Sequence, residues 1–516
     1  MAELENLVVT EKNLVSMVNS YLVNEMDRLE RIRQLIENKK QANEHVPCSP
    51  NIGFASGDST VNPVDAFLNI KRLVHNRNSL LGLLRENTAH DLLSFLSNEV
   101  MPREVDVNGA ATALLRLQDT YQLEPTEIAD GHIGKFAQTT SMTADDTFQV
   151  GYTAFANTDY YHALQWLLIT KEKMDRENGT LSERNRSFTL SMLYDYISYS
   201  MHDRKNPEHA LWYSRALNAI DPKHPSAEYV EIYQQIINES GSEWDGSWRN
   251  LPPIVNKRPM DGVFLEYEAL CRGETRKTPK ELSELYCFRQ QNTPFLKLAP
   301  MKVEIVSFSP YAVVYRGILS DGETEHLKRI ASPQLRRAMV VNDKRQSDTE
   351  AANMEASYRV AKNMWLNDND DSVVARISKR MSEVTGLSME TAEQLQMANY
   401  GLGGHYEPHY DMAVEEDRQV AELNDQRHGN RVATGLFYMS QPVAGGATIF
   451  EELGLAVFPT KNDCLFWYNV HKSGRPDMRT RHAGCPVLLG QKWVANKWIH
   501  ERGQEFRRPC DLSADV

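Results

Sequence analysis

Two residues near the C-terminus have the types and the spacing of metal ligands. His409 and Asp411 are separated by a single residue. On an extended strand, residues i and i+2 point to the same face, so an imidazole and a carboxylate would converge on one point. We expect His482, on a later strand, to be the third ligand. Two histidines and one carboxylate on one face of a metal leave the opposite positions open, which is typical of non-haem Fe(II) oxygenases.

A lysine follows the third candidate ligand. Lys492 lies ten residues after His482, and Gly490 between them predicts a strand, a turn and a second strand. A lysine beside a metal with open positions suits a dicarboxylate co-substrate, since one end can chelate the metal while the other meets the ammonium. The alternative is that His409 and Asp411 form a surface pair on a strand edge, because so short a pattern often arises by chance.

The composition limits the class of protein. A chain of 516 residues should hold about three domains. Its 41% hydrophobic and 25% charged residues are ordinary for a globular protein, and its net charge of −13 argues against a nucleic-acid surface. No run of about 20 apolar residues exists to span a membrane. The first residues lack the basic and apolar regions of a signal peptide.

Apolar residues near the N-terminus recur every three or four positions and predict one long helix over residues 4–36. This apolar stripe consists of Leu14, Val18, Leu22, Met26, Leu29, Ile32 and Ile36. From the pattern alone, an ordinary core face is favoured over a dimer seam.

Residues 144–235 have the small-residue pattern of tetratricopeptide helix pairs. The first pair has small residues at Gly151, Ala154 and Ala163, and the second has Ala210, Leu217 and Pro222 in its second helix. The region is also rich in tyrosine. We expect most of these tyrosines in the core, but as a set they suit a groove for a Pro-rich peptide, because aromatic grooves bind polyproline II helices well.

The C-terminal part predicts a sheet domain. Residues 236–300 contain Gly and Pro breaks and are interpreted as a linker region. From Val303 short strands appear, and after Leu395 the strands alternate with glycine-containing breaks, as an antiparallel double-sheet jelly roll requires. We expect Trp493 to pack in the core and His405 to lie on a solvated loop.

Four segments of this part carry a family resemblance. Residues 395–411, 445–448, 466–469 and 492–509 resemble the catalytic alpha subunit of animal collagen prolyl 4-hydroxylases, and the likeness extends more loosely over essentially the whole chain. The resemblance implies an α+β multidomain fold. Its parts are a helical dimerisation domain (1–140), a tetratricopeptide-like peptide-binding domain (141–240), a linker region (241–300) and a double-stranded β-helix dioxygenase domain (301–516).

The resemblance also implies an activity, namely hydroxylation of proline at C4 in X-Pro-Gly repeats. This reaction couples O2 to decarboxylation of 2-oxoglutarate, yielding succinate and CO2, with Fe(II) and L-ascorbate as cofactors. The implied Fe(II) ligands are His409, Asp411 and His482. The implied 2-oxoglutarate residues are Lys492, Tyr400, Thr448 and His500. Residues implied to hold the substrate proline are Tyr406, Arg431 and Trp498, and those implied to line the peptide groove are Phe155, Tyr196, Tyr199 and Tyr233. Phe155 stands where family members often have tyrosine.

Further implications concern assembly and compartment. The family resides in the endoplasmic reticulum lumen and pairs with protein disulfide isomerase as two alpha and two beta subunits. The resemblance implies disulfides Cys271–Cys287 and Cys485–Cys510. Glycosylation sequons occur at Asn178, Asn185 and Asn238.

Two alternatives remain open. One is a related 2-oxoglutarate hydroxylase that acts on another Pro-rich peptide. The other is a peptide-binding scaffold with an inactive oxygenase domain, which would be expected to lose one of the residues His409, Asp411, His482 and Lys492. The sequence retains all four.

Overall fold

The computed structural model describes most of the chain. The described residues are 4–44, 78–98, 104–134, 137–138, 140–177, 186–225, 227–242, 244–259, 262–337, 359–414, 428–511 and 513. The chain divides into two compact units, of which one holds Glu3–Arg103 and the other holds Met1–Ala2 with Glu104–Val516. None of the helices in the described ranges has the length and apolarity needed to cross a membrane. The sequons at Asn178 and Asn185 lie outside these ranges.

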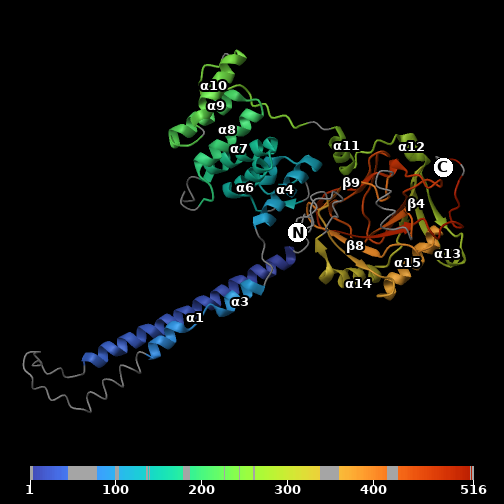
Figure 1. The fold of residues 1–516 in the computed structure, drawn as a ribbon, viewed down its shortest axis with the longest axis horizontal. Coiled ribbons are helices and arrows are strands. Elements are labelled where there is room, and N and C mark those ends of the chain that lie inside the picture. Colours follow the sequence, from blue (N-terminus) through green and yellow to red (C-terminus); the bar gives the residue numbers. More distant parts are fainter. Residues whose placement is uncertain are drawn as a thin grey trace, which may run out of the picture. The chain divides into compact units, whose positions relative to one another are not determined.

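The first unit is built around α1 (Leu4–Glu44), which is longer than the predicted helix (Figure 1). A helix over 78–85 and α3 (His90–Asn98) pack alongside it, and Arg31 of α1 forms an ion pair with Glu86 at 3.0 Å. The pattern alone favoured an ordinary core face for the apolar stripe, and the structure does not agree. Four of its members are exposed by 46–69% in the described structure, namely Leu22, Met26, Leu29 and Ile36.

The second unit begins with helices. They are α4 (Glu104–Tyr121), α5 (Pro125–Ala129), α6 (Ala144–Ala156), α7 (Tyr160–Glu177), α8 (Leu190–Asp203), α9 (Pro207–Ile220) and α10 (Ala227–Ser240), with a small hairpin of β1 (His132–Ile133) and β2 (Ala137–Gln138) after α5. The predicted pairs α6–α7 and α8–α9 are confirmed. A Cβ on Gly151 would lie 3.0 Å from the Leu167 side chain, so the small residue is what allows α6 and α7 to approach closely.

Short elements connect the helices to the sheet domain. They are η2 (Trp248–Asn250), α11 (Gly262–Cys271), α12 (Pro279–Glu284), β3 (Cys287–Gln290) and α13 (Pro294–Leu298). The region expected to be a linker therefore contains β3, which is the first strand of the large sheet.

The sheet domain contains two antiparallel layers. The large sheet has the order β3-β4-β5-β14-β10-β17-β8-β7-β6. Its strands after β3 are β4 (Met301–Phe308), β5 (Tyr311–Arg316), β14 (Cys464–Tyr468), β10 (Arg431–Tyr438), β17 (Lys492–His500), β8 (Leu395–Tyr400), β7 (Lys362–Leu366) and β6 (Arg336–Arg337). The smaller sheet has the order β13-β12-β15-β9, with bounds Leu455–Val457, Thr448–Phe450, His482–Gly484 and Tyr406–His409. Strands β11 (Ala444–Gly445) and β16 (Val487–Leu489) form a separate pair.

Two apolar layers hold this domain together. Leu436, Phe450 and Trp467 belong to a buried cluster formed by strands of both sheets. The other face of the large sheet packs on α14 (Asp321–Ala331) and α15 (Ser372–Thr385), which lie beneath it in Figure 1. The 3₁₀ turns η3 (Ser332–Gln334) and η4 (Met478–Thr480) complete the elements. The predicted double-sheet jelly roll is confirmed.

The two disulfides implied by the resemblance, Cys271–Cys287 and Cys485–Cys510, are both wrong. Cys271 forms a disulfide with Cys485, with 5.6 Å between their Cα atoms. The end of α11 is buried against β12 and β15, in a cluster that includes Tyr267 and Ala483, and this packing brings the two cysteines together. Cys287 and Cys510 are exposed free thiols.

Candidate active site

Three side chains converge on the face of the smaller sheet that packs toward the large sheet. His409 ends β9, His482 begins β15, and the two residues are paired across the antiparallel ladder. The ligand atoms of His409, Asp411 and His482 all lie within 4.8 Å of one another. Nε2 of His409 is 3.7 Å from one carboxylate oxygen of Asp411, and Nε2 of His482 is 3.6 Å from the other. These distances allow the three groups to share one metal ion.

Backbone carbonyls fix the orientation of both imidazoles. Nδ1 of His409 lies 2.7 Å from the Glu407 carbonyl oxygen, and Nδ1 of His482 lies 3.0 Å from that of Thr480. A carbonyl can only accept, so each Nδ1 must carry the proton and each Nε2 keeps its lone pair. Both lone pairs therefore belong to the nitrogens that face Asp411, as metal ligation requires.

Asp411 lies beyond the end of β9, so the predicted same-strand geometry is only partly correct. Neighbouring strands hold its carboxylate instead. The hydroxyl of Thr434 donates to Oδ2 of Asp411 at 2.7 Å, and the amide of Asn469 donates to the Thr434 hydroxyl at 2.9 Å. Arg431 donates to the Asp411 backbone carbonyl at 3.2 Å. Thr434 and Asn469 were not predicted, since Thr434 is a polar residue inside the buried strand β10 and Asn469 directly follows β14, and neither belongs to a motif.

The charges of this group suit a divalent cation. Burial, together with the neighbouring His482, lowers the pKa of His409 well below its usual range. Burial raises the pKa of the Asp411 carboxyl, but the two imidazoles and the Arg431 guanidinium outweigh this effect and hold that pKa below normal. These shifts favour a neutral His409 imidazole and an ionised Asp411 carboxylate, which are the ligand forms that Fe(II) binds.

A buried cation lies next to this group. Lys492 begins β17, pairs with Tyr400 across the ladder and exposes only 3% of its surface. Its Nζ is 3.5 Å from the Thr448 hydroxyl and 5.6 Å from the Tyr400 ring centroid. No acidic side chain of the described residues forms an ion pair with it, and burial lowers its pKa to about 7.

A glycine lies beside Lys492. A Cβ on Gly484 would lie 3.9 Å from Nζ of Lys492 and 3.6 Å from the Cβ of Tyr406. Tyr406 in turn stacks on His409, with 3.6 Å between ring centroids. A buried ammonium with no acidic partner among the described residues, close to the metal ligands, suits one carboxylate of a dicarboxylate whose other end reaches the metal.

The predicted residues Arg431, Trp498 and His500 lie close together around Glu393. Arg431 stacks over the Trp498 ring at 4.0 Å and forms a bidentate pair with Glu393. His500 lies 3.1 Å from the same Glu393 carboxylate and 2.6 Å from the Gly429 carbonyl oxygen. Glu393 orients both Arg431 and His500. It belongs to no sequence motif, because it lies in the loop just before β8.

Two further expectations have different outcomes. Trp493 is buried in the large core, as predicted. His405 is not on a solvated loop, since it exposes 2% of its surface. Its loop is covered by α4, where Ala113 packs on the backbone of Gly403.

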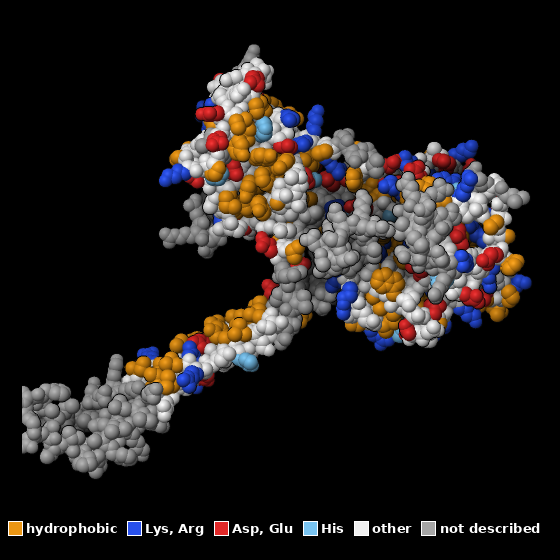
Figure 2. Space-filling view, in the orientation of Figure 1, with side chains coloured by type: hydrophobic (Ala, Val, Ile, Leu, Met, Phe, Trp, Pro, Cys, Tyr) orange, Lys and Arg blue, Asp and Glu red, His pale blue; other side chains and the backbone are white. Residues whose placement is uncertain are grey.

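The predicted groove residues lie in the helical region. Phe155 of α6 contacts Tyr196 and Tyr199 of α8, with ring centroids 4.6 and 5.6 Å apart. Figure 2 shows hydrophobic side chains gathered on one face of the helical region. Tyr199 is 38% exposed. Tyr233 differs, because it is 2% exposed and packs between His202 and Tyr229.

Comparison with protein families agrees with this division of the chain. Residues 1–135 match the prolyl 4-hydroxylase alpha-subunit N-terminal region, and residues 144–239 match the prolyl 4-hydroxylase peptide-substrate-binding domain. Residues 395–500 match the 2OG-Fe(II) oxygenase superfamily. These last residues include every metal ligand described above.

Similar proteins extend over the whole chain. Prolyl 4-hydroxylase subunit alpha-2 of Caenorhabditis elegans is 41% identical over 528 residues, covering 100% of this chain and 93% of its own. Prolyl 4-hydroxylase subunit alpha-1 of Homo sapiens is 38% identical, covering 99% and 95%. A solved viral collagen prolyl hydroxylase from Paramecium bursaria Chlorella virus-1, in complex with 2OG, is 25% identical with a TM-score of 0.30 and covers 38% of this chain and 98% of its own.

Proposed function

Since this chain belongs to the prolyl 4-hydroxylase alpha-subunit family, we propose that its substrate is a collagen-like chain. The enzyme is an Fe(II)- and 2-oxoglutarate-dependent prolyl hydroxylase. We infer hydroxylation at C4 of proline in X-Pro-Gly repeats, coupled to conversion of 2-oxoglutarate and O2 into succinate and CO2. The observation that carries the proposal is the convergence of His409, Asp411 and His482 beside the buried Lys492.

In this proposal the three converging residues hold Fe(II). The metal, with 2-oxoglutarate and O2 bound, supplies the oxidising chemistry that replaces a C–H bond of proline with C–OH. The protein supplies orientation through the backbone bonds to both imidazoles and through the Thr434 hydroxyl on Asp411. Ascorbate, which is typical of the family, would keep the iron in its ferrous form.

We assign the distal carboxylate of 2-oxoglutarate to Lys492, with Tyr400 and Thr448 beside it. Lys492 has no acidic partner in the described structure, so an incoming carboxylate would neutralise a buried charge. We assign His500 to the neighbourhood of the co-substrate and the substrate proline. It is hydrogen-bonded through both ring nitrogens, which supports a fixed orientation.

We assign Tyr406, Arg431 and Trp498 to the substrate proline. Tyr406 stacks on His409, and the guanidinium of Arg431 lies over Trp498. Together they form aromatic and cationic walls next to the metal ligands. Proline is small and apolar, and its preceding carbonyl accepts hydrogen bonds, so walls of this kind suit it.

The aromatic face of the helical domain would bind another part of the same substrate. Phe155, Tyr196 and Tyr199 form one contiguous cluster, which suits an extended Pro-rich chain. Tyr233 is buried beneath, so we infer that it supports Tyr229 and His202. A substrate long enough to occupy both places would be held at a high effective concentration.

We further propose that the chain works in the endoplasmic reticulum lumen, with protein disulfide isomerase, as two alpha and two beta subunits. The disulfide Cys271–Cys485 supports an oxidising compartment. The exposed apolar stripe of α1 supports pairing of two alpha subunits through this helix. Expression alone should give an aggregated or inactive chain, and co-expression with the isomerase should rescue it. A soluble, fully active monomer would contradict this assembly.

The alternative substrate is another Pro-rich peptide, and one assay separates the two. The co-expressed enzyme is supplied with Fe(II), 2-oxoglutarate and ascorbate, and succinate and 4-hydroxyproline are measured with no peptide, with (Pro-Pro-Gly)n and with polyproline. Our proposal predicts coupled formation of both products with (Pro-Pro-Gly)n. Turnover with polyproline but not with (Pro-Pro-Gly)n would contradict a collagen-like substrate.

A further inference from the structure

Helix α4 belongs to the helical domain through one of its faces. Ala111 and Leu115 are part of the buried helical core. Gln118 accepts a hydrogen bond from the Trp166 indole at 2.9 Å and donates one to Gln165 at 2.8 Å. This face fixes α4 relative to α7, and therefore relative to the helices that carry the aromatic cluster.

The opposite face of α4 contacts the jelly roll at the loop between β8 and β9. Arg116 donates to the carbonyl oxygen of Gly403 at 3.2 Å. Gly403 has a φ of +68°, and a Cβ there would lie 2.6 Å from the Cβ of Ala113. The helix therefore rests directly on the backbone of this loop, and only glycine permits the approach.

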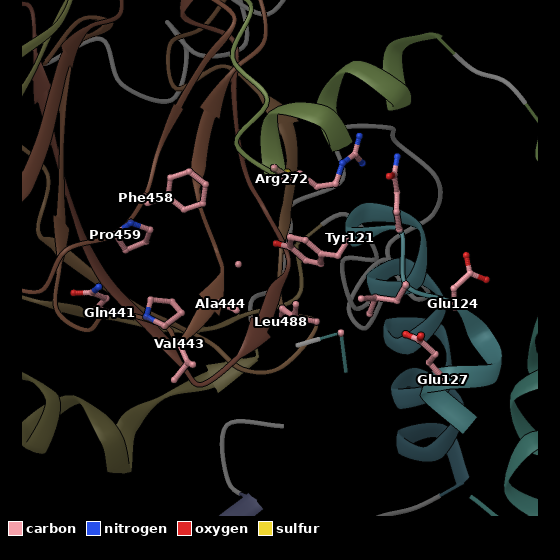
Figure 3. A pocket seen from close by; sticks show the side chains of 16 residues that line it. Tyr121, Glu124, Glu127, Arg272, Gln441, Val443, Ala444, Phe458, Pro459 and Leu488 are labelled. Atoms are coloured by element: carbon pink, nitrogen blue, oxygen red, sulfur yellow. The ribbon is translucent and has the colours of Figure 1, made fainter. Parts of the chain in front are cut away.

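The end of α4 makes a second contact. The hydroxyl of Tyr121 donates to the carbonyl oxygen of Pro486. A Cβ on Gly445 would lie 2.6 Å from the same hydroxyl, so Tyr121 fits against bare backbone here too. Figure 3 shows Tyr121 reaching from the helices toward the strands, at the wall of a pocket of about 570 Å³. Arg272, which directly follows α11, donates to the Thr120 carbonyl at 3.0 Å and so adds a hydrogen bond to the end of α4.

The two contacted segments lead directly to the active site. The loop around Gly403 joins Tyr400 to His409, and Pro486 follows His482 by four residues. The segments are also bonded to each other, because the Gly403 amide donates to the Val487 carbonyl at 2.8 Å and the Val487 amide donates to Gly404 at 3.1 Å. A shift of either segment would therefore move both imidazole-bearing strands.

We propose that Arg116 and Tyr121 are positioning residues for the metal and 2-oxoglutarate site, so that α4 of the peptide-binding half braces the catalytic loops. This inference rests on the proposed function of that site. Neither residue touches a ligand atom. Each acts by holding a backbone segment in the register that brings His409, His482 and Tyr400 together.

The test uses the full chain co-expressed with its partner, in the variants Tyr121→Phe and Arg116→Met. Pro486 also accepts from the Gly446 amide at 3.0 Å, so Tyr121→Phe leaves no buried carbonyl without a donor. Tyr213→Phe is the matched control, because Tyr213 is a buried tyrosine that packs on Tyr194 and Trp212 within the helical core. Metal binding is measured by Co(II) titration followed by visible absorption, and the Michaelis constant for 2-oxoglutarate is measured separately.

We expect each variant to weaken Co(II) binding and raise the 2-oxoglutarate constant by about twofold to tenfold, the equivalent of one ordinary hydrogen bond. Arg116→Lys, which keeps a donor, should recover part of the loss in a way that a general loss of stability would not. Unchanged Co(II) binding in both variants, or an equal loss in Tyr213→Phe, would overturn the proposal. If wild type binds Co(II) but hydroxylates no proline, the proposed function fails and the positioning test still stands.

Discussion

Thr434 of β10 donates its hydroxyl to Oδ2 of Asp411 at 2.7 Å, while Asn469 donates to the Thr434 oxygen from the other side at 2.9 Å. The carboxylate ligand thus depends on two linked hydrogen bonds, one from Thr434 of β10 and one from Asn469, which directly follows β14. These hydrogen bonds hold Asp411 in place, although it lies beyond the end of β9.

Replacing Thr434 with valine keeps the shape of the side chain and removes this hydroxyl. We expect Fe(II) affinity to fall by about 10–100-fold, as for the loss of an outer hydrogen bond to a metal ligand. The measurement is the Fe(II) concentration for half-maximal turnover. Thr324→Val is the matched control, since Thr324 is a buried threonine bonded to Asn462 at 2.7 Å on α14. Equal affinities in wild type and Thr434→Val would show that the hydroxyl does not position the carboxylate.

Lys492→Ala removes the buried ammonium that we assign to 2-oxoglutarate. A hydrogen bond to a charged group contributes about 1.5–3 kcal/mol, so the Michaelis constant for 2-oxoglutarate should rise by roughly tenfold or more. Lys497→Ala is the comparison, because Lys497 is a second buried lysine on β17 but pairs with Asp368 at 3.3 Å. If the constant does not change in Lys492→Ala, another cation binds the co-substrate.

The same lysine gives a dependence on pH. Burial lowers the pKa of Lys492 to about 7, so the ligand-free enzyme loses this charge as pH rises above that value. Binding of 2-oxoglutarate must then take up a proton, and its Michaelis constant should increase between about pH 7 and pH 9. The effect of pH on folding has the opposite direction. The unfolded lysine keeps its proton up to about pH 10.4, so between about pH 7 and that value the contribution of Lys492 to the free energy of unfolding increases with pH. Lys492→Arg, which stays charged, should flatten the binding profile. An equally steep profile in that variant would assign the titration to another group.

Two tyrosines of the helical region are expected to have different roles, one in substrate binding and one in stability. Tyr199 is exposed, so Tyr199→Ala should weaken long (Pro-Pro-Gly)n peptides by about 1–2 kcal/mol and leave short ones nearly unaffected. Tyr233 is buried, so Tyr233→Ala should instead lower the free energy of unfolding by about 3–5 kcal/mol. Michaelis constants for both peptide lengths and thermal midpoints measure these effects. Equal losses for short and long peptides in Tyr199→Ala would mean that Tyr199 supports the fold.

The metal ligands could be predicted from sequence because their chemistry is local. His409 and Asp411 are separated by one residue. Gly490 predicts a turn, after which a second strand returns toward His482 and carries Lys492. The helix pairs α6–α7 and α8–α9 were also predictable, since small residues recur where paired helices approach closely. In contrast, Thr434 and Glu393 act through partners that lie far away in sequence, and no local pattern marks them.

The disulfide and Tyr233 show the same limit in another form. Cys271 pairs with Cys485 because α11 packs on β15, which is a tertiary contact 214 residues apart in sequence. Tyr233 has the same residue type as Tyr199, and only the packing of α10 on α9 decides that one is buried. The prediction that His405 lies on a solvated loop fails for the same reason, because α4 covers that loop.

The most direct test of the account is whether Asp411 is needed for proline hydroxylation. Wild type and Asp411→Ala, each co-expressed with protein disulfide isomerase, are supplied with excess Fe(II), 2-oxoglutarate, ascorbate and a long (Pro-Pro-Gly)n peptide, and 4-hydroxyproline is measured. We predict 4-hydroxyproline from wild type and none from Asp411→Ala, with the fold of the variant intact by circular dichroism. Hydroxylation by Asp411→Ala at a rate near that of wild type would contradict the assignment of this site.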